Sequence, residues 1–124
     1  MYLIQAVNAY AAVLTLMDQE LPFQDAYKVA QLKRELQPHA EFFSKKENEL
    51  VNRYAERNEK GVVWTGPGKF QLRAGTEAEY RDKRLELCSV EVEDHPQQIE
   101  IEKPEKIRPV HIEALEGFVT FKEG

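Results

Sequence analysis

The spacing of the hydrophobic residues changes near Gly61, and this change constrains the fold more than any other feature of the 124-residue sequence. Before Gly61, apolar residues recur every three or four positions, as on one face of a helix. After it, they alternate with polar residues, as in half-buried strands. Since a chain of this length fits one domain, we predict a single α+β domain over residues 1–124. Its helical half is expected at about 1–60 and its β-rich half at about 61–124.

The helical half is predicted to form an antiparallel hairpin of two helices. The first helix carries an apolar face made of Leu3, Ala6, Tyr10, Leu14 and Met17. Pro22 then interrupts the pattern, and either Gln24 or Asp25 can cap the second helix. The short linker around Pro22 makes the two helices neighbours in space.

The second helix carries a seam of apolar residues that recurs every seven positions, formed by Val29, Leu36, Phe43 and Leu50, with Ala26, Ala40 and Tyr54 beside it. We expect this seam to pack mainly on the first helix and the downstream strands. The alternative is that part of it contacts another subunit. Pro38 is expected to kink the helix or to split it in two, because proline removes a backbone donor.

The stretch "WTGPGKFQL", residues 64–72, superficially resembles a phosphate-binding loop. A Walker-type loop requires four residues between its first glycine and the Gly-Lys pair, followed by Ser or Thr. Here only one residue intervenes, and Phe70 stands where the hydroxyl is required. The stretch is instead predicted to be a hairpin turn between "VVWT" and "KFQLR". Trp64 is expected to pack in or near the core, or alternatively to anchor a contact with a partner.

The stretch "VEVEDHPQQIEIE", residues 90–102, predicts a second hairpin. Val90 and Val92 would share one face with Ile99 and Ile101. The opposite face would hold the four carboxylates of Glu91, Glu93, Glu100 and Glu102. This face is either a solvated surface that prevents aggregation or a surface for a basic partner. A Ca²⁺ or Mg²⁺ site is the least favoured interpretation, because such ions need converging oxygens.

Two short helices complete the predicted architecture. Thr76 can cap a helix over "TEAEYRDKRLELC", and "PVHIEALEGFV" has the spacing of a short C-terminal helix. The fold class is therefore an N-terminal antiparallel helical hairpin packed on a small antiparallel β-sheet and closed by a short C-terminal helix.

No catalytic or metal-binding constellation is visible in the sequence. The three histidines, His39, His95 and His111, lack metal-ligand spacing, and neither serine stands beside a plausible base. Cys88 has Leu85, Leu87 and Val90 close by in the sequence and is expected to be a small buried residue. We therefore predict a protein that is not an enzyme, with no catalytic residue, no cofactor and no metal.

Charge and cysteine content indicate the compartment. The net charge of −5 favours solubility and argues against direct binding to nucleic acid. A single cysteine excludes an internal disulfide and suits a reducing environment. The apolar N-terminal stretch lacks a basic start and ends at Asp18, so neither a secretory signal nor a membrane span is predicted. The expected location is the cytoplasm.

The stretches "AYKVAQLKRELQPHAEFF" and "KENELVNRYAE", within residues 26–56, resemble a family of short, uncharacterised proteins encoded by phages and prophages of Gram-positive bacteria. The order of elements is similar over nearly the full length, but the "TGPGKF" turn has no place in that pattern. The resemblance implies a viral setting, a non-enzymatic role and the cytoplasm of a host cell. It transfers no functional residue to this chain.

Together these inferences predict an accessory protein that acts through protein–protein contacts, either in virion assembly or by blocking a host defence component. The predicted partner is a phage or host protein, for which a basic surface is one option, and no membrane is involved. The predicted contact residues are Glu91, Glu93, Glu100, Glu102 and Trp64. One alternative is a protein that sequesters a nucleotide or metabolite through Arg73, Tyr80 and Arg84. The other is a structural homo-oligomer built through the seam.

Overall fold

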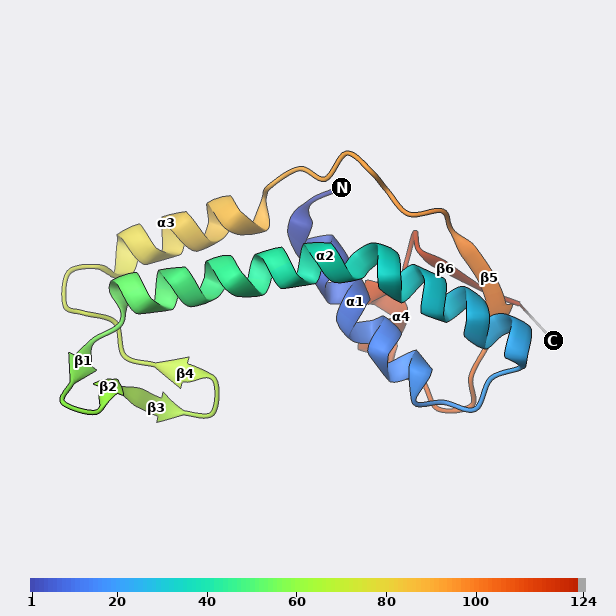
Figure 1. Cartoon of the computed structure of the whole chain (residues 1–124), viewed down its shortest axis with the longest axis horizontal. Coiled ribbons are helices and arrows are strands. Elements are labelled where there is room, and N and C mark those ends of the chain that lie inside the picture. Colours follow the sequence, from blue (N-terminus) through green and yellow to red (C-terminus); the bar gives the residue numbers. More distant parts are fainter. Residues whose placement is uncertain (123–124) are drawn as a thin grey trace.

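The computed structural model describes residues 1–122, which form four helices and six short strands (Figure 1). The helices are α1 (Leu3–Met17), α2 (Phe23–Tyr54), α3 (Glu77–Cys88) and α4 (Pro109–Ala114). The strands are β1 (Arg57–Asn58), β2 (Gly61–Val62), β3 (Trp64–Gly66), β4 (Lys69–Phe70), β5 (Ile99–Glu102) and β6 (Val119–Lys122). The mixture of helix and strand agrees with the prediction from the sequence.

The first helix, α1, buries only part of the predicted face: Leu3 and Ala6 are buried as expected, and Tyr10 packs against the core. Its buried residues are Leu3, Ala6, Ala9, Ala12, Val13 and Leu16, whereas Leu14 and Met17 are 40% and 44% exposed. Both faces have helical spacing, so periodicity alone did not distinguish them. The alanines lie in one core cluster with α2 residues such as Leu32. Small side chains let two helices approach closely, and that approach selected the observed face.

The long helix α2 runs through Pro38 without a break. The prediction that Pro38 splits the helix is therefore wrong. Pro38 is exposed, so water can hydrogen-bond to the carbonyl that proline leaves without a donor. A helix of 32 residues is about 48 Å long, which is more than α1 covers. Figure 1 shows α1 against the N-terminal part of α2 and α3 alongside its C-terminal part.

The strands form three separate two-stranded sheets rather than one antiparallel sheet. Strands β1 and β2 are antiparallel, as are β3 and β4, whereas β5 and β6 are parallel. Gly68, with φ +69°, permits the tight turn between β3 and β4, so the turn predicted within "WTGPGKFQL" is confirmed. A helical hairpin lying on one sheet is not confirmed.

The hairpin predicted over "VEVEDHPQQIEIE" is wrong. Strand β5 pairs in parallel with β6, so that Ile99 lies opposite Val119 and Ile101 opposite Phe121. The "VEVE" segment instead makes one isolated bridge, between Glu91 and Tyr2. Alternation identifies which side chains share a face of a strand, but it does not identify the neighbouring strand.

The third helix is confirmed at Glu77–Cys88, although Thr76 does not cap it with its side chain. The Thr76 hydroxyl instead donates to the carbonyl of Arg73. The last helix, α4, is confirmed as a short helix but ends at Ala114. Phe118 follows a turn at Gly117, which has φ +86°, and the chain then enters β6.

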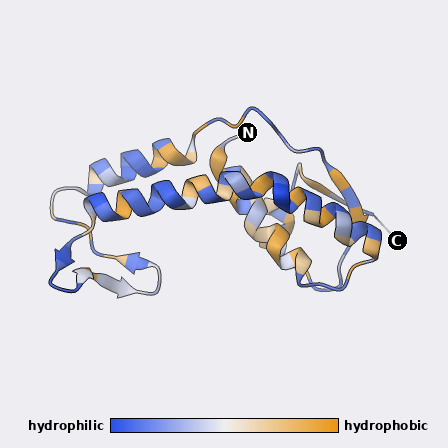
Figure 2. Ribbon diagram, viewed as in Figure 1, coloured by the Kyte–Doolittle hydropathy of each residue, from blue (hydrophilic) through white to orange (hydrophobic). Residues whose placement is uncertain are grey.

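The hydrophobic core lies where α1, the first half of α2, α4, β5 and β6 meet, and we call this region the body. The second half of α2 extends from it with α3 and strands β1 to β4, and we call this extension the arm (Figure 1). Figure 2 shows hydrophobic residues concentrated in the body and mainly hydrophilic residues along the arm. A small cluster of Leu3, Phe43 and Leu87 joins the two regions.

Asp25 connects the start of α2 to β5. The N-cap position of α2 is Pro22, so the predicted capping by Gln24 or Asp25 is wrong. The Asp25 carboxylate is 6% exposed and accepts a hydrogen bond of 3.0 Å from the backbone N–H of Glu102. Lys28 adds a second link, because its ammonium donates to the carbonyl of Glu100.

Candidate protein-binding surfaces

The four predicted contact glutamates are all exposed, but they do not form one acidic face of a hairpin. Glu91 and Glu93 lie in the segment after α3, and Glu100 and Glu102 lie in β5. These two segments pair with different parts of the chain. The prediction that the four carboxylates share one face is therefore wrong, because it depended on the hairpin. Binding of a basic partner by the individual glutamates stays a prediction.

Trp64 lies on the β3–β4 hairpin of the arm and is 60% exposed. The expectation that it packs in the core is therefore wrong. The Trp64 ring is in contact with the ring of Phe70: their centroids lie 6.3 Å apart, with an interplanar angle of 77°. This is the edge-to-face geometry that aromatic pairs prefer.

Trp64 is the outermost member of a row of four aromatic rings. Phe70 contacts Tyr80 with centroids 5.5 Å apart, and Tyr80 contacts Tyr54 at 6.0 Å, both edge-on. Tyr54, at the end of α2, is only 2% exposed. The row, which we call the aromatic row, therefore extends from a buried anchor on α2 through α3 to the exposed hairpin. Four separate elements supply it, namely α2, α3, β3 and β4, so the order of residues in the sequence did not reveal it.

The hydroxyl of Tyr54 donates a hydrogen bond of 2.9 Å to a carboxylate oxygen of Glu79 on α3. Burial, followed by this hydrogen bond, raises the pKa of Tyr54 above its ordinary value of 10.0. The folded state therefore favours the protonated phenol, which holds α2 and α3 together at the base of the aromatic row.

Replacing Tyr54 with phenylalanine is expected to reduce the loss of stability at high pH. A raised pKa contributes stability that is complete below the ordinary value of 10.0 and is lost as the pH rises through the folded-state value. The wild type should therefore lose more free energy of unfolding above about pH 10 than Tyr54→Phe does. Urea denaturation at a series of pH values measures this difference. Parallel pH profiles for the two proteins would contradict the assignment.

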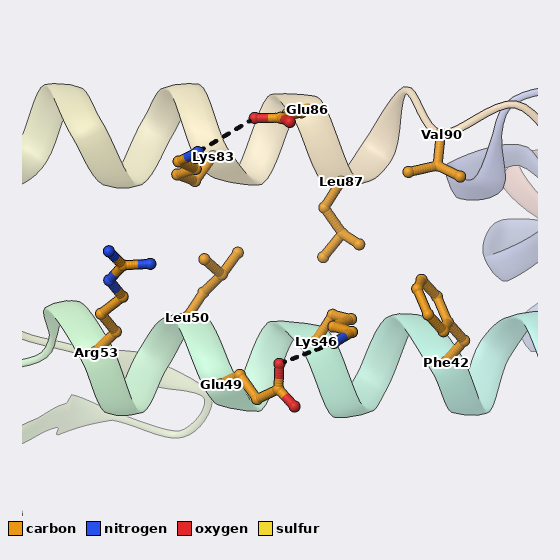
Figure 3. A pocket seen from close by; sticks show the side chains of 9 residues that line it. All are labelled: Phe42, Lys46, Glu49, Leu50, Arg53, Lys83, Glu86, Leu87 and Val90. Carbon is orange, nitrogen blue, oxygen red and sulfur yellow. Dashed lines mark hydrogen bonds and ion pairs between the residues drawn. The ribbon is translucent and has the colours of Figure 1, made fainter.

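A groove of about 290 Å³ lies between α2 and α3 on the arm (Figure 3). Its apolar lining consists of Phe42 and Leu50 on α2, Leu87 on α3, and Val90 just after the end of α3. Charged residues complete its lining: Lys46, Glu49 and Arg53 on α2, and Lys83 and Glu86 on α3. We call this feature the α2–α3 groove. Two ion pairs lie within its lining, Lys46 with Glu49 at 3.2 Å and Lys83 with Glu86 at 3.6 Å.

The predicted seam of α2 is largely used inside the chain. Val29, Leu36 and Phe43 are buried, with exposures of 1%, 0% and 5%, as the prediction of mainly internal packing requires. Leu50 is half-buried and lines the α2–α3 groove. Of these four seam residues, Leu50 is therefore the one that remains accessible to another molecule.

The three residues of the predicted ligand site already make contacts within the arm. Arg84 forms an ion pair with Glu47, and Tyr80 lies in the aromatic row. The Arg73 guanidinium donates to the carbonyl of Arg53. These contacts hold the arm together, so the geometry gives this site no particular support.

Across residues 1–122, no group of three or more His, Cys, Asp or Glu side chains is placed to hold a metal ion. None of the helices in that range combines the length and hydropathy needed to cross a membrane. No family model, no curated protein and no solved structure matches the chain.

Proposed function

We propose that this protein is a non-enzymatic accessory protein that acts by binding another protein, with Trp64 as the central contact residue. The observation that carries the proposal is a tryptophan that is 60% exposed yet supported by a neighbouring ring. Tryptophan is enriched among the residues that dominate binding energy at interfaces. A side chain that is already positioned loses less conformational freedom on binding.

The aromatic row supports this role because it fixes the hairpin that carries Trp64. The backbone provides further support: Gln71 donates to the carbonyl of Val63, and Arg73 donates to the carbonyl of Tyr54. The contact residue is therefore held on a short hairpin that is attached to the end of a long helix. Such an exposed, apolar and pre-positioned side chain suits insertion into a pocket of a partner.

The viral setting of the proposal comes from the sequence resemblance within residues 26–56. In that setting the partner is a phage structural protein or a host defence component in the host cytoplasm. Residues 91–124 contain nine acidic and four basic residues, whereas residues 39–90 contain nine acidic and ten basic. The field of the acidic segment favours approach of a basic partner surface.

Replacing Trp64 with alanine is expected to weaken partner binding by about tenfold or more. Wild-type and Trp64→Ala proteins are immobilised at equal density and exposed to lysate of the host, and captured proteins are quantified by mass spectrometry. The partner found with the wild type should be depleted with Trp64→Ala. Affinity is then measured with that partner in purified form.

The matched control is Phe23→Ala. Phe23 is an aromatic residue, 96% exposed, and it begins α2 at the end opposite the arm. Capture should be unchanged in this variant, and circular dichroism should show that both variants are folded. Equal capture by wild type and Trp64→Ala would overturn the proposal, as would equal losses for the two variants.

A further inference from the structure

The α2–α3 groove leaves apolar surface uncovered on the arm. Phe42 and Val90, at the end of the groove nearest the body, are 46% and 41% exposed. Leu50 and Leu87 point between the two helices in Figure 3, and the charged side chains flank them. An apolar strip with charges on both sides is the arrangement by which helices recognise one another. The pattern of those charges indicates which helices would cover the groove.

The groove residues on α2 have complementary partners when their order is reversed. Phe42, Lys46, Glu49 and Arg53 are spaced four, three and four residues apart, so they follow one stripe of the helix. When the stripe is read from Arg53 back to Phe42, the spacing is again four, three and four. Arg53 then takes the position of Phe42, and Glu49 takes the position of Lys46. An identical helix laid antiparallel on this stripe would place Lys46 opposite the second copy's Glu49.

The ends of the stripe are complementary in the same arrangement. Phe42 would lie opposite Arg53 of the second copy, and a guanidinium over an aromatic ring is a favourable contact. Within the chain, the Lys46 ammonium lies 5.8 Å from the centre of the Phe42 ring and the Arg53 guanidinium lies 5.5 Å from that of Tyr54. These rings therefore already accept cations at their faces.

Helix α3 carries the same self-complementary order on the other side of the groove. Lys83 and Glu86 are three residues apart and form the ion pair of 3.6 Å. A two-fold axis that crosses both helices reverses α2 and α3 together, so it places Lys83 opposite Glu86 of the second copy. Both sides of the groove thus meet the requirement of a two-fold interface, in which one patch contacts its own copy.

We infer that the chain forms a two-fold symmetric dimer in which the α2–α3 groove of one copy covers that of the other. The antiparallel pairs α2–α2 and α3–α3 then form a four-helix contact that buries Phe42, Leu50 and Val90 in both copies. A foreign helix of uniform charge would meet both signs along each side of the groove. In the dimer, Lys46 lies opposite Glu49 of the second copy, and Lys83 lies opposite Glu86. This pairing of opposite charges favours a second copy over other occupants of the groove.

The dimer is independent of the proposed role of Trp64, which is absent from the lining of the groove. The variant Trp64→Ala should therefore dimerise as the wild type does. For this reason, a negative result in the Trp64 binding experiment can be distinguished from a negative result in the dimerisation experiment.

The test uses two single charge reversals, Lys46→Glu and Glu49→Lys, in the full chain. Each reversal creates two like-charge pairs across the two-fold axis, so dimerisation should weaken by roughly tenfold or more. A 1:1 mixture of the two variants restores opposite charges across the interface and should form a heterodimer. The double variant with both reversals should dimerise again. Sedimentation equilibrium over a range of concentrations measures each association constant.

The matched control is Lys45→Glu, which reverses an exposed charge on α2 next to the groove but not in its lining. Its dimerisation should equal that of the wild type, and circular dichroism should show that all variants are folded. A wild type that stays monomeric up to its solubility limit would overturn the inference. So would a dimer that neither reversal weakens, a mixture that stays monomeric, or a control that behaves like Lys46→Glu.

Discussion

Replacing Leu36 with alanine is expected to lower the free energy of unfolding by about 2–5 kcal/mol. Leu36 is 0% exposed and lies in the main core cluster with residues of α1, α4, β5 and β6. The loss has two parts, the transfer free energy of the deleted methyl and methylene groups and the cavity left behind. Elements from both ends of the chain surround the site, so collapse around the cavity requires several elements to move together.

Urea denaturation at a fixed protein concentration measures this loss, because association with any partner copy changes the apparent stability. The control is Leu85→Ala on α3, since Leu85 is 65% exposed. Its effect should stay within about 0.5 kcal/mol. A Leu36→Ala variant as stable as this control would contradict the assignment of Leu36 to the core.

Replacing Asp25 with alanine is expected to cost about 1.5–3 kcal/mol. The carboxylate is buried and accepts the hydrogen bond from the Glu102 N–H. Alanine leaves that donor without its partner at the edge of β5. It also removes a negative charge from the first turn of α2, where the helix dipole favours one.

The variant Asp25→Asn separates these contributions, because it keeps an acceptor oxygen and loses only the charge. It should be less destabilising than Asp25→Ala. Hydrogen exchange supplies a local readout: the Glu102 amide should exchange faster in Asp25→Ala than in Asp25→Asn. Equal losses and equal exchange rates in the two variants would show that the hydrogen bond contributes little.

The helices were the most predictable part of the fold, for a local reason. Helical spacing acts over a few residues, so α2, α3 and α4 were expected close to where they lie. The errors arose where a second element decides. Which face of α1 is buried depends on how closely α2 approaches it. Whether Pro38 breaks α2 depends on whether its side of the helix is exposed to water.

The candidate site, too, was predictable from the sequence only in part. Trp64 was predictable as a residue of interest, because it is a single tryptophan beside a turn. Its exposure and its support by Phe70, Tyr80 and Tyr54 were not predictable, since three elements contribute these rings. The α2–α3 groove likewise needed the antiparallel placement of two helices separated by 22 residues of loop and hairpin (residues 55–76).

The sequence by itself determined the change from helical to alternating spacing, the turn at Gly68, and the absence of a Walker-type phosphate loop. Each of these depends on residues close together in the chain. Only the tertiary structure decided that β5 pairs with β6 in parallel, so that the four glutamates never share a hairpin face. The alternating pattern of β5 is equally compatible with pairing to residues 90–93 and with pairing to β6. Burial of Ile101 and Val119 in one core, which brings distant segments together, selected between them.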